Sequence, residues 1–112
     1  MSTGRELTDL TLIEVASGIR KGAFSSEEIT RHCLTRINQA QPILNCFISI
    51  DEESAIKSAQ KADREVASGD KLGVLHGVPL AHKDMFYKKG IKSTGGSKIQ
   101  KDFIPSYTST VV

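Results

Sequence analysis

The chain has 112 residues, 38% of them hydrophobic and 25% charged, which is the composition of an ordinary soluble globular protein. Its formal net charge of +2 is too small to indicate nucleic-acid binding by itself, and no apolar run is long enough to span a bilayer. Residues 1–6 lack the apolar core of a secretory leader, so we expect a cytoplasmic protein without a membrane partner.

The first half of the chain predicts helices behind a loose lead-in of residues 1–10. Thr11 and Glu14 form a capping-box pattern, and Gly22 is suited to end that helix. The apolar residues of its inner face recur at helical spacing: Leu12, Val15, Ala16 and Ile19. Ser25 and Glu28 mark a second helix, which Pro42 is expected to stop. The inner face of this helix is expected to comprise Ile29, Cys33, Leu34, Ile37 and Ala40.

Two predicted strands flank a third predicted helix. Residues 44–50 alternate as a strand does. Asp51 can cap a helix that ends at Gly69 and Asp70. Its inner face is Ala55, Ala59, Ala62 and Val66, and its outer face is Lys57, Lys61 and Arg64. Residues 80–83 are the second strand, and residues 106–110 could begin another helix. The expected fold class is α/β, with helices packed on an incomplete mixed sheet.

Lys83 stands at the end of the apolar run from Gly77 to Met85. Burying a lysine is costly unless it is paired or loses its proton. Such a lysine either reaches out to solvent or is placed there for its chemistry. The residues alone leave both interpretations open.

Three segments resemble the amidase signature family: residues 72–84 (LGVLHGVPLAHKD), residues 93–97 (STGGS) and residues 107–112 (YTSTVV). The earlier segments around Leu12, Ser25 and Asn45 are also similar to the family, so the resemblance covers nearly the whole chain. It implies the amidase signature fold, of which residues 1–112 would be the N-terminal portion of a single domain.

The resemblance implies a Ser–cis-Ser–Lys triad, and Lys83 matches its lysine, the general base. A lysine shielded from water can accept a proton near neutral pH, and Val78, Leu80 and Ala81 are expected to supply that shielding. The two serines and the oxyanion hole belong to a Gly/Ser-rich signature expected beyond residue 112. Ser97 lies too close to Lys83 to be the nucleophile, so we expect residues 1–112 alone to be inactive.

Other side chains carry alternatives that the sequence leaves open. Asp84 could orient Lys83 or cap a turn, and His82 should face away from Lys83 if both lie on a strand. The histidine and cysteine spacings fit no zinc pattern, so no metal or other cofactor is expected. Cys33 and Cys46 are expected to be reduced core thiols.

The resemblance implies amide hydrolysis on a small amide substrate in the full-length form. One alternative is the A subunit of a tRNA-dependent glutamyl or aspartyl amidotransferase, the only case in which we would expect a nucleic-acid partner. Another is a non-catalytic structural or binding module. A homodimer is left open. The basic second half, with lysines 83, 88, 89, 92, 98 and 101, is most simply a solvated surface.

Overall fold

The computed structural model describes residues 6–110 and residue 112. The predicted absence of a secretory leader rests mainly on residues 1–5, which lie outside the described part, as does Val111 of the last matching segment. The chain divides into two compact units, Met1–Pro79 and Leu80–Val112. Each unit is described by itself below.

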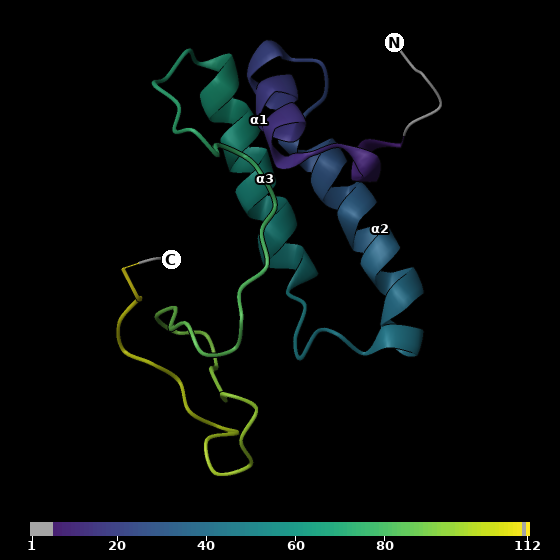
Figure 1. The fold of residues 1–112 in the computed structure, drawn as a ribbon. Coiled ribbons are helices and arrows are strands. Elements are labelled where there is room, and N and C mark those ends of the chain that lie inside the picture. Colours follow the sequence, from purple (N-terminus) through teal and green to yellow (C-terminus); the bar gives the residue numbers. More distant parts are fainter. Residues whose placement is uncertain (1–5, 111) are drawn as a thin grey trace. The chain divides into compact units, whose positions relative to one another are not determined.

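The first unit is helical. A 3-10 helix, η1 (Leu7–Asp9), precedes the helices α1 (Leu12–Lys21), α2 (Ser26–Leu44) and α3 (Glu52–Ala67), which Figure 1 shows gathered in one bundle. None of the helices in the described part is long and apolar enough to cross a membrane. Within the predicted lead-in, residues 6–10 are more ordered than expected, because Arg36 of α2 donates to Thr8 Oγ1 over 3.0 Å and pairs with Asp9.

Both ends of α1 match the prediction. Thr11 Oγ1 accepts from Glu14 N over 3.2 Å, and Glu14 Oε1 accepts from Thr11 N over 2.9 Å, which completes the capping box. Gly22 ends the helix in the left-handed conformation, with φ of 74°. The predicted inner face is correct except at Leu12, which is 50% exposed.

Helix α2 begins as predicted but ends later. Ser25 caps it through a 2.9 Å bond from Glu28 N. Pro42 was expected to stop the helix and instead lies inside it. The last turn of the helix, which contains the proline, is closed by Asn45 N donating to Gln41 O over 2.8 Å. Asn45 takes the left-handed conformation that ends the helix.

The start of α2 depends on a residue from another helix. Asp63 of α3 accepts from Ser26 N over 2.6 Å and from Glu27 N over 3.0 Å. These are backbone donors of the first turn, which have no partner within their own helix. Asp63 therefore joins α3 to the N-terminus of α2.

Helix α3 follows the prediction closely. Asp51 caps it by accepting from Ser54 N over 3.0 Å, and Gly69 at φ of 75° makes the exit turn. Ala59 and Ala62 are buried on its inner face, whereas Lys57, Lys61 and Arg64 are exposed. Alanines on that face let neighbouring chain segments approach closely.

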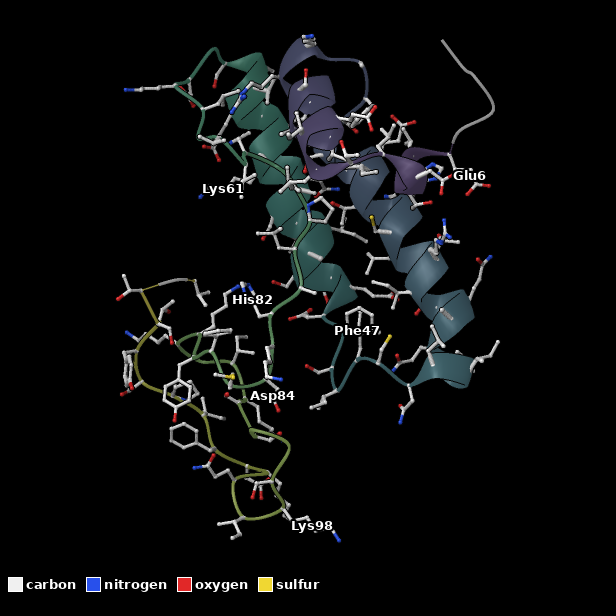
Figure 2. All side chains as sticks on the ribbon, in the orientation of Figure 1. Glu6, Phe47, Lys61, His82, Asp84 and Lys98 are labelled. Atoms are coloured by element: carbon white, nitrogen blue, oxygen red, sulfur yellow. The ribbon has the colours of Figure 1, made fainter. Side chains whose placement is uncertain are left out.

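The core of the first unit lies where the three helices meet. It centres on Val15 and Ile19 of α1 and Ile29 of α2, with Cys33 and Val66 packed against it. The other partly buried residues around this cluster are Leu7, Leu10, Phe24 and Val78. Figure 2 shows the Phe47 ring, from the loop between α2 and α3, turned back toward these helices.

The predicted strands are not formed in the described part of the chain. Residues 45–50 and 80–83 have no regular structure, and Leu44 belongs to α2. The sheet of the predicted α/β fold is therefore not present among residues 6–110 and 112. A strand is stable only when its N–H and C=O groups pair with a neighbouring strand, and the pairing found here is one isolated bridge between Lys88 and Ile91.

The second unit is built from turns and loops. Tyr87 packs its ring against Phe103 and Tyr107, with centroid distances of 5.3 and 5.5 Å. The helix predicted from residue 106 is not formed over residues 106–110. Instead, the hydroxyls of Thr108 and Ser109 accept from the backbone N–H groups of Lys89 and Tyr87, over 3.0 and 2.9 Å. These hydroxyls accept hydrogen bonds from backbone N–H groups of a distant segment, rather than from the N–H groups of a helix's first turn.

Candidate functional site

Lys83 begins the second unit's first turn. Its carbonyl oxygen accepts from Met85 N over 2.7 Å and from Phe86 N over 3.1 Å, which fixes its backbone. Its side chain is exposed and forms no ion pair with any residue in 6–110 or 112. Two of the three residues expected to shield it, Leu80 and Ala81, are exposed, Leu80 to 62%. The third, Val78, is partly buried against the core of the first unit.

Asp84, the next residue, binds a loop ten residues further on. Its carboxylate accepts from Thr94 N at 3.0 and 3.1 Å and from the Thr94 hydroxyl, and its backbone oxygen accepts from Gly95 N over 2.8 Å. The Thr94 hydroxyl, followed by the nearby backbone N–H groups, lowers the pKa of Asp84 below its usual value of 3.8. Of the two roles left open for Asp84, the structure supports the capping of a turn, and the Asp84 carboxylate forms no ion pair with the Lys83 ammonium.

The loop bound by Asp84 is the small, polar segment 93–97. Gly95 and Gly96 both have positive φ, 58° and 72°, a conformation that favours glycine. Gly96 N donates to Thr94 Oγ1 over 3.1 Å, and Ser97 N donates to Thr94 O over 2.9 Å. The hydroxyl of Ser93 is buried and has no hydrogen-bond partner among the described residues. Sequence reasoning identified this segment but not its bond to Asp84, because side-chain pairing across ten residues has no local signal.

The apolar run before Lys83 is attached to the helices of the first unit. The Ser26 hydroxyl donates to Gly77 O over 2.5 Å, and His76 Nε2 lies 2.9 Å from Ala62 O. Gly77 has φ of 76°, and a Cβ there would lie 3.1 Å from Ser26 Oγ. The residue pair His76 and Gly77 thus serves to anchor the chain just before it enters the second unit.

The remaining polar candidates do not form a reactive centre. His82 is exposed beside Lys83, and the strand geometry that predicted its direction is not formed. The lysines at 83, 88, 89, 92, 98 and 101 are all exposed, in agreement with a solvated surface. No group of three or more metal-ligating side chains is found among residues 6–110 and 112.

The two cysteines differ from each other, and one prediction is wrong. Cys33 is half-buried against the core, and burial raises the pKa of its thiol. Cys46 is exposed rather than part of the core, and its Sγ lies 3.9 Å from Gln41 Oε1. Its segment was predicted to be a strand, and it is instead a loop that Gln41 holds through both backbone groups of Phe47.

A shallow apolar hollow lies on the first unit, between α1 and the loop after α3. It is lined by Leu12, Ile13, Ala16, Ser17, Arg20, Val74 and Leu75. The Arg20 guanidinium donates to Gly73 O over 2.6 Å. The lining supplies neither a nucleophile with an adjacent base nor a metal-ligating cluster, so it is not a candidate catalytic site.

The comparisons with known proteins define the class of this chain. A family model described as Amidase matches residues 28–112, and the chain therefore belongs to the amidase (amidase signature) family. It is 46% identical, over 90% of its length, to the glutamyl-tRNA(Gln) amidotransferase A subunit of Hahella chejuensis (strain KCTC 2396). It is 48% identical, over 92% of its length, to the protein of the same name from Pseudomonas syringae pv. tomato (strain ATCC BAA-871 / DC3000). The chain spans 21% of the length of each of these relatives.

A solved structure supports the same assignment. Its chain comes from a vestigial protein complex that bears on the evolutionary origins of an s-triazine catabolic enzyme. The two chains superpose with a TM-score of 0.82 at 28% identity, over 91% of this chain and 22% of that one. The family resemblance drawn from the sequence is thus confirmed, together with the partial coverage of the amidase signature fold.

Proposed function

We propose that this chain is the N-terminal portion of a single amidase signature domain that cleaves a carboxylic amide C–N bond. The main support is the family match over residues 28–112, which includes the Lys83-Asp84 pair.

In the proposed reaction, Lys83 is the general base. Neutral Lys83 would accept the proton of the nucleophilic serine through the cis serine, while the nucleophilic serine attacks the amide carbonyl. By resemblance, both serines and the oxyanion hole lie in the Gly/Ser-rich signature. A base without these groups gives almost no catalysis, because they act as a unit.

The site needs a cover that the described residues of the second unit do not provide. Leu80 is an apolar side chain that is 62% exposed, and Lys83 beside it is exposed. We propose that residues 44–50 and 80–83 become strands of a mixed sheet when the rest of the domain supplies neighbours. The same packing would remove water from Lys83, which favours its neutral form.

The coding sequence after Val112 tests the domain proposal. We expect a reading frame that continues into a glycine- and serine-rich segment. A stop codon directly after Val112 would contradict the proposal and favour the non-catalytic module.

Replacement of Lys83 tests the assignment of the base. In the protein with the complete domain, Lys83→Ala should lower turnover by about 10²- to 10⁴-fold, the range for general acid–base catalysis. Lys98→Ala is the matched control, since Lys98 is another exposed lysine of the second unit (Figure 2) and should leave turnover unchanged. Equal turnover in the two variants would end the assignment.

A second candidate function is favoured by the relatives. The chain is 43–48% identical to several proteins named as the A subunit of glutamyl-tRNA(Gln) amidotransferase. On this basis the amide would be that of glutamine, and the released ammonia would pass to a glutamyl-tRNA with the help of partner subunits. Ammonia release from glutamine that rises with partner subunits and charged tRNA would support it, whereas release from simple amides alone would favour an independent amidase.

The expected location and partners of the protein depend on which of the two candidate functions holds, the independent amidase or the amidotransferase A subunit. A tRNA-dependent role places the protein in the cytoplasm with partner subunits and tRNA, whereas an independent amidase requires only its small amide substrate. A homodimer is compatible with either. Size-exclusion chromatography with light scattering, with and without the partner subunits, distinguishes these assemblies.

A further inference from the structure

Asp84 links two parts of the second unit that are separate in the sequence. Asp84 is the second residue of the turn that begins at Lys83. The carbonyl oxygen of Lys83 closes this turn by accepting from Met85 N and Phe86 N. The Asp84 carboxylate accepts from both the backbone and the hydroxyl of Thr94. One side chain therefore connects the backbone of Lys83 to the loop 93–97.

The backbone N–H groups of the loop bound by Asp84 all have acceptors within the second unit. The N–H groups of four consecutive residues, 94 to 97, donate to Asp84 or to Thr94. Consecutive N–H groups of this kind often bind an external anion, but here each of them already donates to Asp84 or to Thr94. The arrangement is therefore suited to holding chain segments in place rather than to capturing a ligand.

Asp84 does not act on the ammonium of Lys83 directly. Its carboxylate is engaged by Thr94, and Lys83 forms no ion pair with any residue in the described part of the chain. Any effect of Asp84 on Lys83 must therefore pass through the backbone of the turn. A base must lie within hydrogen-bond reach of the proton it takes, so the position of that backbone matters for catalysis.

We propose that Asp84 is a positioning residue for Lys83. Its bonds to Thr94 hold the turn that carries Lys83 in a fixed position relative to the loop 93–97. This inference rests on the proposed function, since it requires Lys83 to be the base. It goes beyond that function by assigning a role to the Asp84–Thr94 pair, which is outside the Ser–cis-Ser–Lys triad.

The test uses kinetics of the protein with the complete domain on its amide substrate. Asp84→Asn and Thr94→Val should each lower kcat by about 10²-fold, the cost of a displacement of roughly 1 Å at a reacting group, with KM nearly unchanged. Thr94→Ser keeps the hydroxyl and should retain most of kcat. Asp102→Asn is the matched control, because Asp102 is an exposed carboxylate of the same unit whose ionic partner is Lys92.

Two double variants separate positioning from a general loss of structure. If Asp84 and Thr94 act together, Asp84→Asn with Thr94→Val should cost no more than the worse single variant. If Asp84 acts through Lys83, Asp84→Asn should have no further effect on the residual turnover of Lys83→Ala. A further fall in that residual turnover would overturn the proposal, as would a kcat for Asp84→Asn equal to that of Asp102→Asn.

The outcomes also distinguish this inference from the proposed function. Full turnover in Lys83→Ala would overturn both. Loss of turnover in Lys83→Ala together with normal kcat in Asp84→Asn and Thr94→Val would overturn only the positioning role. If Asp84→Asn does not fold, the comparison of Thr94→Val with Thr94→Ser decides, since a normal kcat in both would contradict the proposal.

Discussion

Ser26 and Gly77 are joined by a hydrogen bond of 2.5 Å, from the hydroxyl of one to the carbonyl oxygen of the other. Ser26 is almost completely buried at the start of α2, and Gly77 lies in the matching segment before Lys83. Because Gly77 has positive φ and approaches Ser26 closely, this contact explains why the segment carries a glycine there. The link is structural, and it holds the start of the apolar run in the first unit.

A substitution at Gly77 should therefore be costly. Gly77→Ala would force a side chain into the left-handed conformation and place Cβ 3.1 Å from Ser26, so we expect a loss of about 1–3 kcal/mol in the free energy of unfolding. Gly73→Ala is the control, because its φ is not positive and no atom lies within 4 Å of a Cβ there. Urea denaturation measures both; similar stability in the two variants would contradict the account.

The core of the first unit predicts a contrast between two isoleucines. Ile29 is 1% exposed at the centre of the core, so Ile29→Ala should lower the free energy of unfolding by about 2–5 kcal/mol. Ile13 of α1 is 79% exposed, and Ile13→Ala should change it by less than about 0.5 kcal/mol. Thermal and urea unfolding report the difference. An equal loss in the free energy of unfolding for the two variants would mean that the helices do not pack as described.

Asp84 predicts an acid-dependent component of stability. Its pKa is lowered in the folded state by the Thr94 hydroxyl and by nearby backbone N–H groups, below the value of about 3.9 expected when unfolded. The stabilisation is therefore complete above that unfolded value and is lost as pH falls through the folded pKa. Urea denaturation between pH 7 and pH 2 should show this component in the wild type and not in Asp84→Asn. Parallel curves for the two proteins would argue against it.

The two thiols should react at different rates. Cys46 is exposed, whereas Cys33 is half-buried and burial raises the pKa of its thiol. Because the thiolate is the reactive form, iodoacetamide at neutral pH should label Cys46 first, and Cys33 should need higher pH or unfolding. Peptide mass spectrometry over time reads out each site. Faster labelling of Cys33 would indicate that it does not pack against the core as described.

The helices could be predicted because their signals are local. Thr11, Ser25 and Asp51 each accept a bond from a residue three positions later, so the pattern that marks a helix start is complete within a few residues. The Gly22 exit turn is local in the same way. The prediction at Pro42 was wrong because α2 continues through the proline to Leu44, and its last turn is closed by the bond from Asn45 N to Gln41 O.

The strands and the surroundings of Lys83 could not be predicted in this way. A strand needs a partner that its own sequence does not name, and residues 45–50 and 80–83 have none in the described part of the chain. The exposure of Leu80 and Lys83 likewise depends on what packs over them, not on their own side chains.

The amino-acid sequence alone was enough to identify the family of this protein, the three helix starts and Lys83 as the candidate base. The three-dimensional packing was needed to show that Asp63 binds the first turn of α2, that Ser26 holds Gly77 and that Asp84 binds Thr94. The physical reason is that helix caps and family motifs are contained in short stretches of chain. These contacts instead join residues 10 to 51 positions apart, whose meeting depends on how the whole unit packs.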